Sequence, residues 1–496
     1  MWRRRVRARF ALIALAALGF WALADLTLKA GPSLGGIGQA GGFLRRAWPL
    51  DFPPLGEILT QVGRTMAVVL LATLVSVLLG GALAVAATVG RRFTAGASRV
   101  ALTAARALPD VVLAVIFIRF FGLGALPAVL AMGLHSAGMV GRLYAAAVEQ
   151  ADRGPQEALR AVGAGRIQTF CTAVLPQVAP SFLSIALYRL DINLRISAIL
   201  GYVGSTGIGT ELAMAFGRLD YQRGMAWAVV LFVLCALTEI SSGAIRRHGI
   251  PARLCKVVAV GGVLAVGWAI VASGVLEVDL AGNWLETLTL FWPPTTAGAE
   301  LGTALLTTVQ VALAATALGA LVAVPLGSVA ASNVAPNRFV YFVSRAVVLI
   351  VRSIPELVLA VLFLLIAGPG PVAATLALAV GASGLLGKLV ADSTEQLPPS
   401  PALALRSVGA SRLQTFFGAT FRQGVPDLVS NLLYQLDSNL RAATLLGIVG
   451  GGGIGLYLLQ AMRTREYAVV TMILLLLFAV VLSLELLATR LVRRIR

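Results

Sequence analysis

The stretch YRLDINLRISAILGYVGSTGIG (188–209) returns later in the chain as YQLDSNLRAATLLGIVGGGGIG (434–455). The two copies start 434 − 188 = 246 residues apart, and two further segments repeat at the same offset. These are RALPDVVLAVIFI (106–118) with RSIPELVLAVLFL (352–364), and LRAVGAGRIQTF (159–170) with LRSVGASRLQTF (405–416). A constant offset over about 100 residues indicates gene duplication and fusion. We therefore expect two homologous halves, residues 1–250 and 251–496.

The composition around these repeats is that of a membrane protein. Hydrophobic residues make up 58% of the chain, charged residues 12%, and the mean hydropathy is +0.89. Continuous apolar runs such as 66–88 and 467–488 exceed the roughly 20 residues needed to cross a bilayer, and they lack the alternation of strands. The sequence predicts an all-α integral membrane protein with about twelve transmembrane helices, arranged as two parallel six-helix repeats.

The net charge of +18 is explained by the ends of the predicted spans. Arginines gather in RRRVRAR (3–9), at 246–247 and in RLVRRIR (490–496), which the positive-inside rule places on the cytoplasmic side. This excludes nucleic acid as the expected partner. We expect a multi-pass protein of a bacterial inner membrane with both termini cytoplasmic, and the longer segments 28–62 and 276–302 at the outer surface as short interfacial helices.

No catalytic or metal site is predicted. Three cysteines and two histidines show no metal-ligand spacing, and no nucleophile–base arrangement occurs. His135 lies in an apolar span opposite Gly381 of the second copy, which favours packing or a hydrogen bond. Asp110 and Glu356 are expected to pair locally. The segment GASGLLGK (381–388) lacks the spacing and the Ser or Thr of a phosphate-binding loop, so the chain is predicted to hold no ATPase site.

The polar loop EALRAVGAGRIQTFCTAVLP (157–176) has the spacing of a known docking motif. Glu157-Ala158, Gly163 and Leu175-Pro176 resemble the "EAA" loop of ABC-transporter permeases. In the second copy the loop at 403–422 departs from this pattern, because the Glu and the Leu-Pro are absent. We therefore expect two docking loops of unequal quality. The docking residues implied by the resemblance are Glu157, Ala158, Arg160, Gly163, Arg166 and Gln168 in the first loop, and Arg406, Gly409, Arg412 and Gln414 in the second.

Together the three repeated segments resemble the permeases of phosphonate/phosphate-type ABC importers, within the MetI-like permease family. The resemblance covers about residues 60–245 and 300–490 and implies a fused, two-copy permease. It also implies two cytoplasmic ABC ATPase subunits that bind ATP and magnesium, since no cofactor is expected on this chain. A periplasmic or lipid-anchored solute-binding protein would deliver a small oxyanion.

Charged residues inside a membrane span are costly and commonly functional. On a helix Tyr188, Asp191 and Arg195 form one stripe, and Asp191 can pair with Arg195 at i, i+4, while Asn193 points nearly the opposite way. Two interpretations stay open, a structural ion pair or a guanidinium that faces the transported anion. The residues assigned to the pathway are Tyr188, Asp191, Asn193, Arg195, Tyr434, Asp437, Asn439 and Arg441, with Arg106 and Arg352 at the cytoplasmic ends of their spans.

We thus predict a permease subunit that moves phosphonate- or phosphate-type oxyanions from a binding protein to the cytoplasm. One alternative is an ABC permease for another small solute, methionine or betaine, which would need no paired intramembrane arginines. Another is an ion-coupled secondary transporter, for which Asp191 and Asp437 would be the titratable groups.

Overall fold

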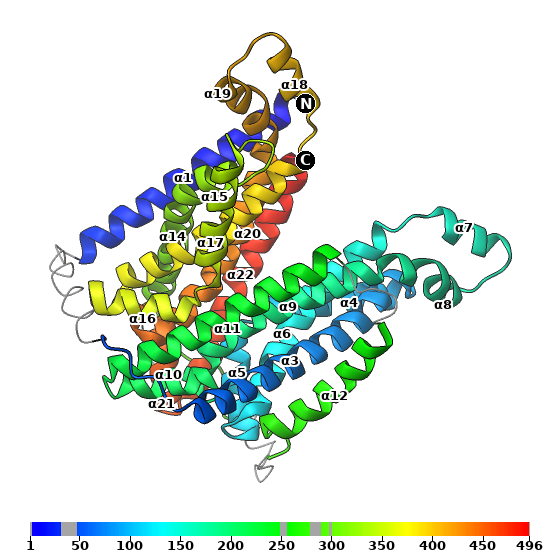
Figure 1. The fold of residues 1–496 in the computed structure, drawn as a ribbon. Coiled ribbons are helices and arrows are strands. Elements are labelled where there is room, and N and C mark those ends of the chain that lie inside the picture. The colour runs from blue at the N-terminus through cyan, green and yellow to red at the C-terminus, as the bar shows by residue number, and fades with distance from the viewer. Residues whose placement is uncertain (1, 31–46, 249–254, 278–288, 297–299, 496) are drawn as a thin grey trace. The chain divides into compact units, whose positions relative to one another are not determined.

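The computed structural model describes residues 2–30, 47–248, 255–277, 289–296 and 300–495 (Figure 1). Helices account for the regular structure of these residues, and no strand occurs among them. The predicted all-α fold is confirmed. Of the segments predicted to hold interfacial helices, residues 31–46, 278–288 and 297–299 lie outside those described. The prediction is wrong for 47–62, because 47–54 are not helical and 55–62 begin the long helix that follows.

The helices of the first repeat follow the predicted order. They are α3 (Leu55–Val89), α4 (Arg92–Ala107), α5 (Asp110–Phe121), α6 (Ala125–Glu149), α9 (Leu175–Val203), α10 (Ile208–Gly217) and α11 (Tyr221–His248). Between α4 and α5 the chain bends by 90° at Pro109. Leu108 adopts an extended conformation there, as the residue before a proline prefers, and this ends α4.

The second repeat reproduces these bounds at the offset read from the sequence. Its helices are α14 (Leu301–Val329), α15 (Arg338–Ser353), α16 (Glu356–Ala367), α17 (Pro371–Glu395), α20 (Phe421–Leu446), α21 (Ile454–Arg463) and α22 (Tyr467–Ile495). The start of α15 lies 338 − 92 = 246 residues after that of α4, and α16, α17 and α21 keep the same distance. The same local sequence signals therefore produce the same helix ends twice.

The first helix of each repeat packs with the helices of the other repeat. Residues 1–46 and 290–496 form one compact unit and residues 47–289 the other. In the first unit α1 (Trp2–Ala30) lies along α14, and in the second α12 (Cys255–Ser273) lies along α3 (Figure 1). The boundary near residue 250 separates the two sequence repeats, and it stays a prediction for the domains. Each compact unit, in contrast, contains the first helix of the other repeat.

Within the described residues, up to ten helical segments are long and apolar enough to cross a membrane when each strongly bent helix pair counts as one. Seven are single helices, and three are bent pairs. Two of the predicted spans fall outside this count: α6, and α12, of which Gly261–Ser273 forms a shorter apolar helix. Their counterparts, α17 and α1, pass by length and composition.

Candidate functional site

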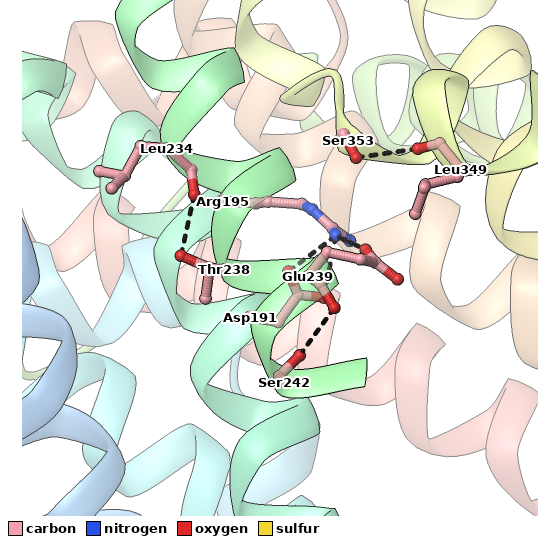
Figure 2. Close-up of polar contacts among 8 residues, drawn as sticks. All are labelled: Asp191, Arg195, Leu234, Thr238, Glu239, Ser242, Leu349 and Ser353. Carbon is pink, nitrogen blue, oxygen red and sulfur yellow. Dashed lines mark hydrogen bonds and ion pairs between the residues drawn. The ribbon is translucent and has the colours of Figure 1, made fainter. Parts of the chain in front are cut away.

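A buried cluster of three charged side chains lies between α9 and α11. The Nη2 atom of Arg195 donates to both carboxylate oxygens of Asp191 at 2.9 Å and to Oε2 of Glu239 at 2.6 Å (Figure 2). The side chains of Asp191 and Glu239 are 2% and 5% exposed, and that of Arg195 is 17% exposed. The predicted i, i+4 pair is confirmed. The cluster thus places two carboxyl groups on one guanidinium.

The second repeat contains the equivalent pair on α20. Nη1 of Arg441 donates to Oδ2 of Asp437 at 2.6 Å, and both side chains keep some exposure, 12% and 15%. Glu485 lies 246 residues after Glu239, at the matching position of α22. Tyr188 and Tyr434, one turn before each pair, are partly buried. The substrate-pathway role assigned to these residues stays a prediction.

Asn193 and Asn439 bind neighbouring helices rather than open space. Asn193 is fully buried, where its Nδ2 donates to Thr73 of α3 at 3.0 Å and its Oδ1 accepts from Ser136 of α6 at 2.8 Å. In the second repeat Nδ2 of Asn439 donates to Thr316 of α14 at 2.8 Å. The predicted orientation away from the charged stripe is confirmed for both asparagines, and their place in the pathway stays a prediction.

These contacts show that the offset between the two repeats is different at their second helices, α3 and α14, from the offset elsewhere. Thr316 lies 316 − 73 = 243 residues after Thr73, three fewer than the offset elsewhere. Thr65 and Thr308 obey the same shorter offset, and each accepts a hydrogen bond from the first backbone N–H of α10 or α21 at 2.9 Å. An indel of three residues between this helix and the next accounts for the difference.

Arg106 and Arg352 end α4 and α15, next to close helix crossings. A Cβ atom on Gly138 of α6 or Gly384 of α17 would lie 2.7 Å from the backbone nitrogen of the respective arginine, so glycine permits the contact. Arg352 is 4% exposed and Arg106 is partly buried. Their role at the entrance of a pathway stays a prediction.

His135 forms the local contacts expected of it. Its Nδ1 lies 2.8 Å from the Leu108 carbonyl oxygen and 3.2 Å from Oδ1 of Asp110, with the ring buried. The predicted hydrogen bond is confirmed, as is the local pairing of Asp110. In the second repeat Glu356 lies beside Gly381, so a longer acidic side chain occupies the room that the missing imidazole leaves.

The first predicted docking loop is an exposed pair of short helices. It comprises α7 (Gly154–Ala161), α8 (Arg166–Thr169) and the wider helical turn Phe170–Val174 that leads into α9. Gly163 joins the two with a φ of 86°, a conformation that favours glycine. Gln168 turns back on its own helix, because its Oε1 accepts from the Gly165 backbone N–H at 2.8 Å. Glu157, Ala158, Arg160 and Arg166 are exposed.

The second loop has the same backbone despite its different sequence. Helices α18 (Ser400–Ser407) and α19 (Arg412–Thr415) repeat the bounds of α7 and α8 at the 246-residue offset, and Gly409 has a φ of 84°. Gln414 accepts from the Ser411 backbone N–H at 2.8 Å, and Arg406 is exposed. The loss of the Glu and the Leu-Pro therefore leaves the loop's folding intact, and whether docking differs between the loops stays a prediction.

The two loops are attached to their bundles with different strength. Arg412 donates to the carbonyl oxygen of Pro336 at 2.7 Å, whereas Arg166 lies 3.5 Å from the matching oxygen of Gly90. Beside Pro336, Arg345 of α15 binds Asp392 at 3.0 Å and Glu395 at 2.9 Å, both on α17. The corresponding pair of the first repeat, Arg99–Glu149, is 3.6 Å long and exposed. Arg412 thus makes a shorter contact to its bundle than Arg166 does, and α15 is tied to α17 by the stronger ion pairs.

The sequence reasoning missed Glu239 and the apolar tips of the docking loops. Glu239 was detectable as an acidic residue inside the last span that recurs as Glu485 at the common offset. On the loops, Val162 and Ile167 are 79% and 73% exposed, and their counterparts Val408 and Leu413 are 78% and 71% exposed. The signal for these four was an apolar residue repeated within an otherwise polar motif.

Comparison with known proteins identifies both repeats. The family described as binding-protein-dependent transport system inner membrane component matches residues 58–248 and again residues 323–496. The chain belongs to this family. The predicted two-copy permease is therefore confirmed, and the chain is an integral membrane permease subunit without an ATPase site of its own. The family implies an ATPase and a binding protein as partners.

Several curated proteins are similar to this family member. The phosphate-import permease protein PhnE of Mycolicibacterium smegmatis is 40% identical over 440 residues, which cover 83% of this chain and 82% of that protein. The phosphite transport system permease protein PtxC of Stutzerimonas stutzeri is 38% identical over 227 residues, 45% of this chain and 82% of PtxC. The probable D-methionine transport system permease protein MetI of Haemophilus influenzae is 27% identical over 181 residues, 34% of this chain and 85% of MetI.

Proposed function

We propose that this chain forms the membrane pathway of an ATP-driven importer for phosphate- or phosphonate-type oxyanions. The observation that carries the proposal is the 40% identity to a phosphate-import permease over 440 residues, which span both repeats. A phosphite permease matches at 38% over about one repeat, so relatives with this scaffold are named for two related oxyanions, phosphate and phosphite. The methionine permease is less similar, at 27%, which makes a methionine substrate the weaker alternative.

Arg195 and Arg441 are the proposed contacts for the passing anion. A guanidinium binds a phosphate-type oxyanion through parallel hydrogen bonds. Asp191 and Asp437 would keep each arginine oriented and would compete with the anion, so the anion binds weakly and leaves. In the first repeat Glu239 strengthens this competition, because it adds a second carboxylate at 2.6 Å. The contact with Glu239 also joins α9 to α11, so in the first repeat a structural role and a transport role coexist.

The exposed apolar tips of the docking loops are the proposed anchors for two ABC ATPase subunits. Val162 and Ile167 on one loop, and Val408 and Leu413 on the other, would enter apolar hollows on the ATPases. Buried apolar anchors surrounded by polar residues are typical of protein interfaces. Glu157, Arg160 and Arg406 would form the polar rim. Closure of the ATPases around ATP and magnesium would move the loops and, through α9 and α20, the charged pairs.

The proposed orientation places the docking loops and both chain termini in the cytoplasm of a bacterial cell. The arginines at the ends of the predicted spans support it through the positive-inside rule. A periplasmic or lipid-anchored binding protein would then deliver the oxyanion at the opposite face, in the inner membrane. Most of the choice between phosphate, phosphite and phosphonate would lie in that binding protein.

Reconstitution tests this function directly. The permease, its ATPase and its binding protein are placed in vesicles, and uptake of labelled phosphate, phosphite, a simple phosphonate and methionine is measured with ATP inside. We expect uptake of at least one phosphorus oxyanion, and none with a hydrolysis-deficient ATPase. Uptake confined to methionine would contradict the proposed substrate, and uptake that continues without ATP hydrolysis would contradict the importer class.

A further inference from the structure

An apolar groove of about 690 Å³ runs along the first helix of the unit formed by residues 1–46 and 290–496. Its walls come from α1, α14, α20 and α22, and every lining side chain is apolar. Phe10, Ala14 and Leu18 contribute one wall, and Leu436, Leu484 and Leu487 contribute others.

Helix α1 packs closely against α14 at one end and more loosely at the other, where Leu12 and Leu15 are only partly buried. Gly19 meets Ala317 of α14 so closely that a Cβ atom on Gly19 would lie 2.4 Å from that of Ala317, and Asp25 accepts a hydrogen bond from Gln310 at 2.8 Å. From residue 10 to residue 18, in contrast, no described side chain of α1 is fully buried. A second apolar hollow of about 310 Å³ lies along the other side of this same stretch.

Hydrocarbon is the occupant that fits this groove. The helices that line it are apolar and long enough to cross a membrane, alone or as part of a bent pair. Water would find no hydrogen-bond partner on its walls, and a space of this size does not stay empty within a close-packed structure. Lipid tails are as apolar as leucine side chains, so an acyl chain can fill the groove at little cost.

Positive charge at one end of the groove selects the headgroup. Arg490, on α22 next to the lining residue Leu491, is exposed. In the sequence five arginines stand between residues 3 and 9, directly before the lining residue Phe10, and three more follow Arg490 in the last four residues. The ends of α1 and α22 lie on the same side of this unit (Figure 1). We propose that this groove binds an anionic phospholipid, with an acyl chain between α1 and α22 and the phosphate at Arg490.

Native mass spectrometry of protein extracted from vesicles of phosphatidylglycerol and phosphatidylcholine tests the site. We expect phosphatidylglycerol to stay bound in preference to phosphatidylcholine. The variant Ala14→Phe fills the groove and should lose most of this lipid. Ala17→Phe is the matched control, since Ala17 is exposed on the same helix and lines neither hollow. Equal phosphatidylglycerol retention by Ala14→Phe and Ala17→Phe would overturn the proposal. Such a result would mean that another protein segment, or nothing specific, occupies the groove.

The headgroup contact is tested separately. Arg490→Gln should weaken phosphatidylglycerol retention about fivefold, the effect expected for one arginine near an anionic membrane surface. Arg463→Gln, an exposed arginine at the end of α21, should leave retention unchanged. Should Ala14→Phe fail to fold, Leu18→Trp keeps a large apolar side chain in the groove and reports by fluorescence. Brominated phosphatidylglycerol should quench this tryptophan more than brominated phosphatidylcholine, and equal quenching would refute selection of anionic lipid.

Discussion

Replacing Arg195 by Gln removes the positive charge that Asp191 and Glu239 share. Both carboxylates are at most 5% exposed, so the variant leaves two like charges together in a buried site. Breaking a buried ion pair in this way costs about 3–5 kcal/mol. We expect the unfolding temperature to fall on the order of 10 °C, using the usual relation for domains of this size. Thermal unfolding of the purified protein in detergent, followed by tryptophan fluorescence, measures it.

Two companion variants separate structural loss from loss of transport. Adding Glu239→Gln to Arg195→Gln removes the excess carboxylate and should restore part of the unfolding temperature. Arg441→Gln should cost less than Arg195→Gln, because the side chain of Asp437 is 15% exposed and that of Asp191 only 2%. Unfolding of Arg195→Gln at the wild-type temperature would refute the reasoning. If such a stable variant lost oxyanion uptake, Arg195 would serve transport and would contribute nothing to stability.

Three further changes test the helix contacts and the docking loops. Thr73→Val takes away the acceptor for Asn193 Nδ2 and should lower the free energy of unfolding by about 1–3 kcal/mol, seen in thermal unfolding; no change would mean that the bond is dispensable. Arg345→Gln should destabilise the protein more than Arg99→Gln, since an exposed pair like that of Arg99 is worth about 0–1 kcal/mol. Equal effects of the two substitutions would contradict the stronger ion pairing of Arg345. Gly163→Ala forces a φ of 86° on a residue with a Cβ, at about 1–2 kcal/mol, and should reduce substrate-stimulated ATP hydrolysis in the reconstituted complex. Unaltered stimulation would show that this turn does not transmit the signal.

The helices and their order could be predicted from the sequence because they depend on local signals. Apolar runs, Pro109 and the repeated glycines act within a few residues of where they stand, so the duplication reproduces the same helix ends. The Asp191–Arg195 pair was predictable for the same reason, since i, i+4 neighbours on a helix meet whatever surrounds them.

The docking loops show where local reasoning was incomplete. The resemblance located both loops, but it did not reveal that Gln168, a predicted docking contact, also caps its own helix. The absence of the Glu and Leu-Pro in the second copy suggested a weaker loop, yet that loop folds as the first does and contacts its bundle through Arg412. That contact joins residues far apart in the chain, and the motif contains no information about it.

The sequence by itself determined two six-element membrane repeats, their family resemblance and the charged pair within each. Only the tertiary structure decided that Glu239 joins Arg195, that α3 and α14 differ by a three-residue register, and that α1 packs along α14. The physical reason is the distance along the chain over which each interaction acts. Helix formation and i, i+4 pairing depend on neighbours in the chain, whereas the partner of a buried charge and the packing of an apolar helix depend on which helix lies beside it.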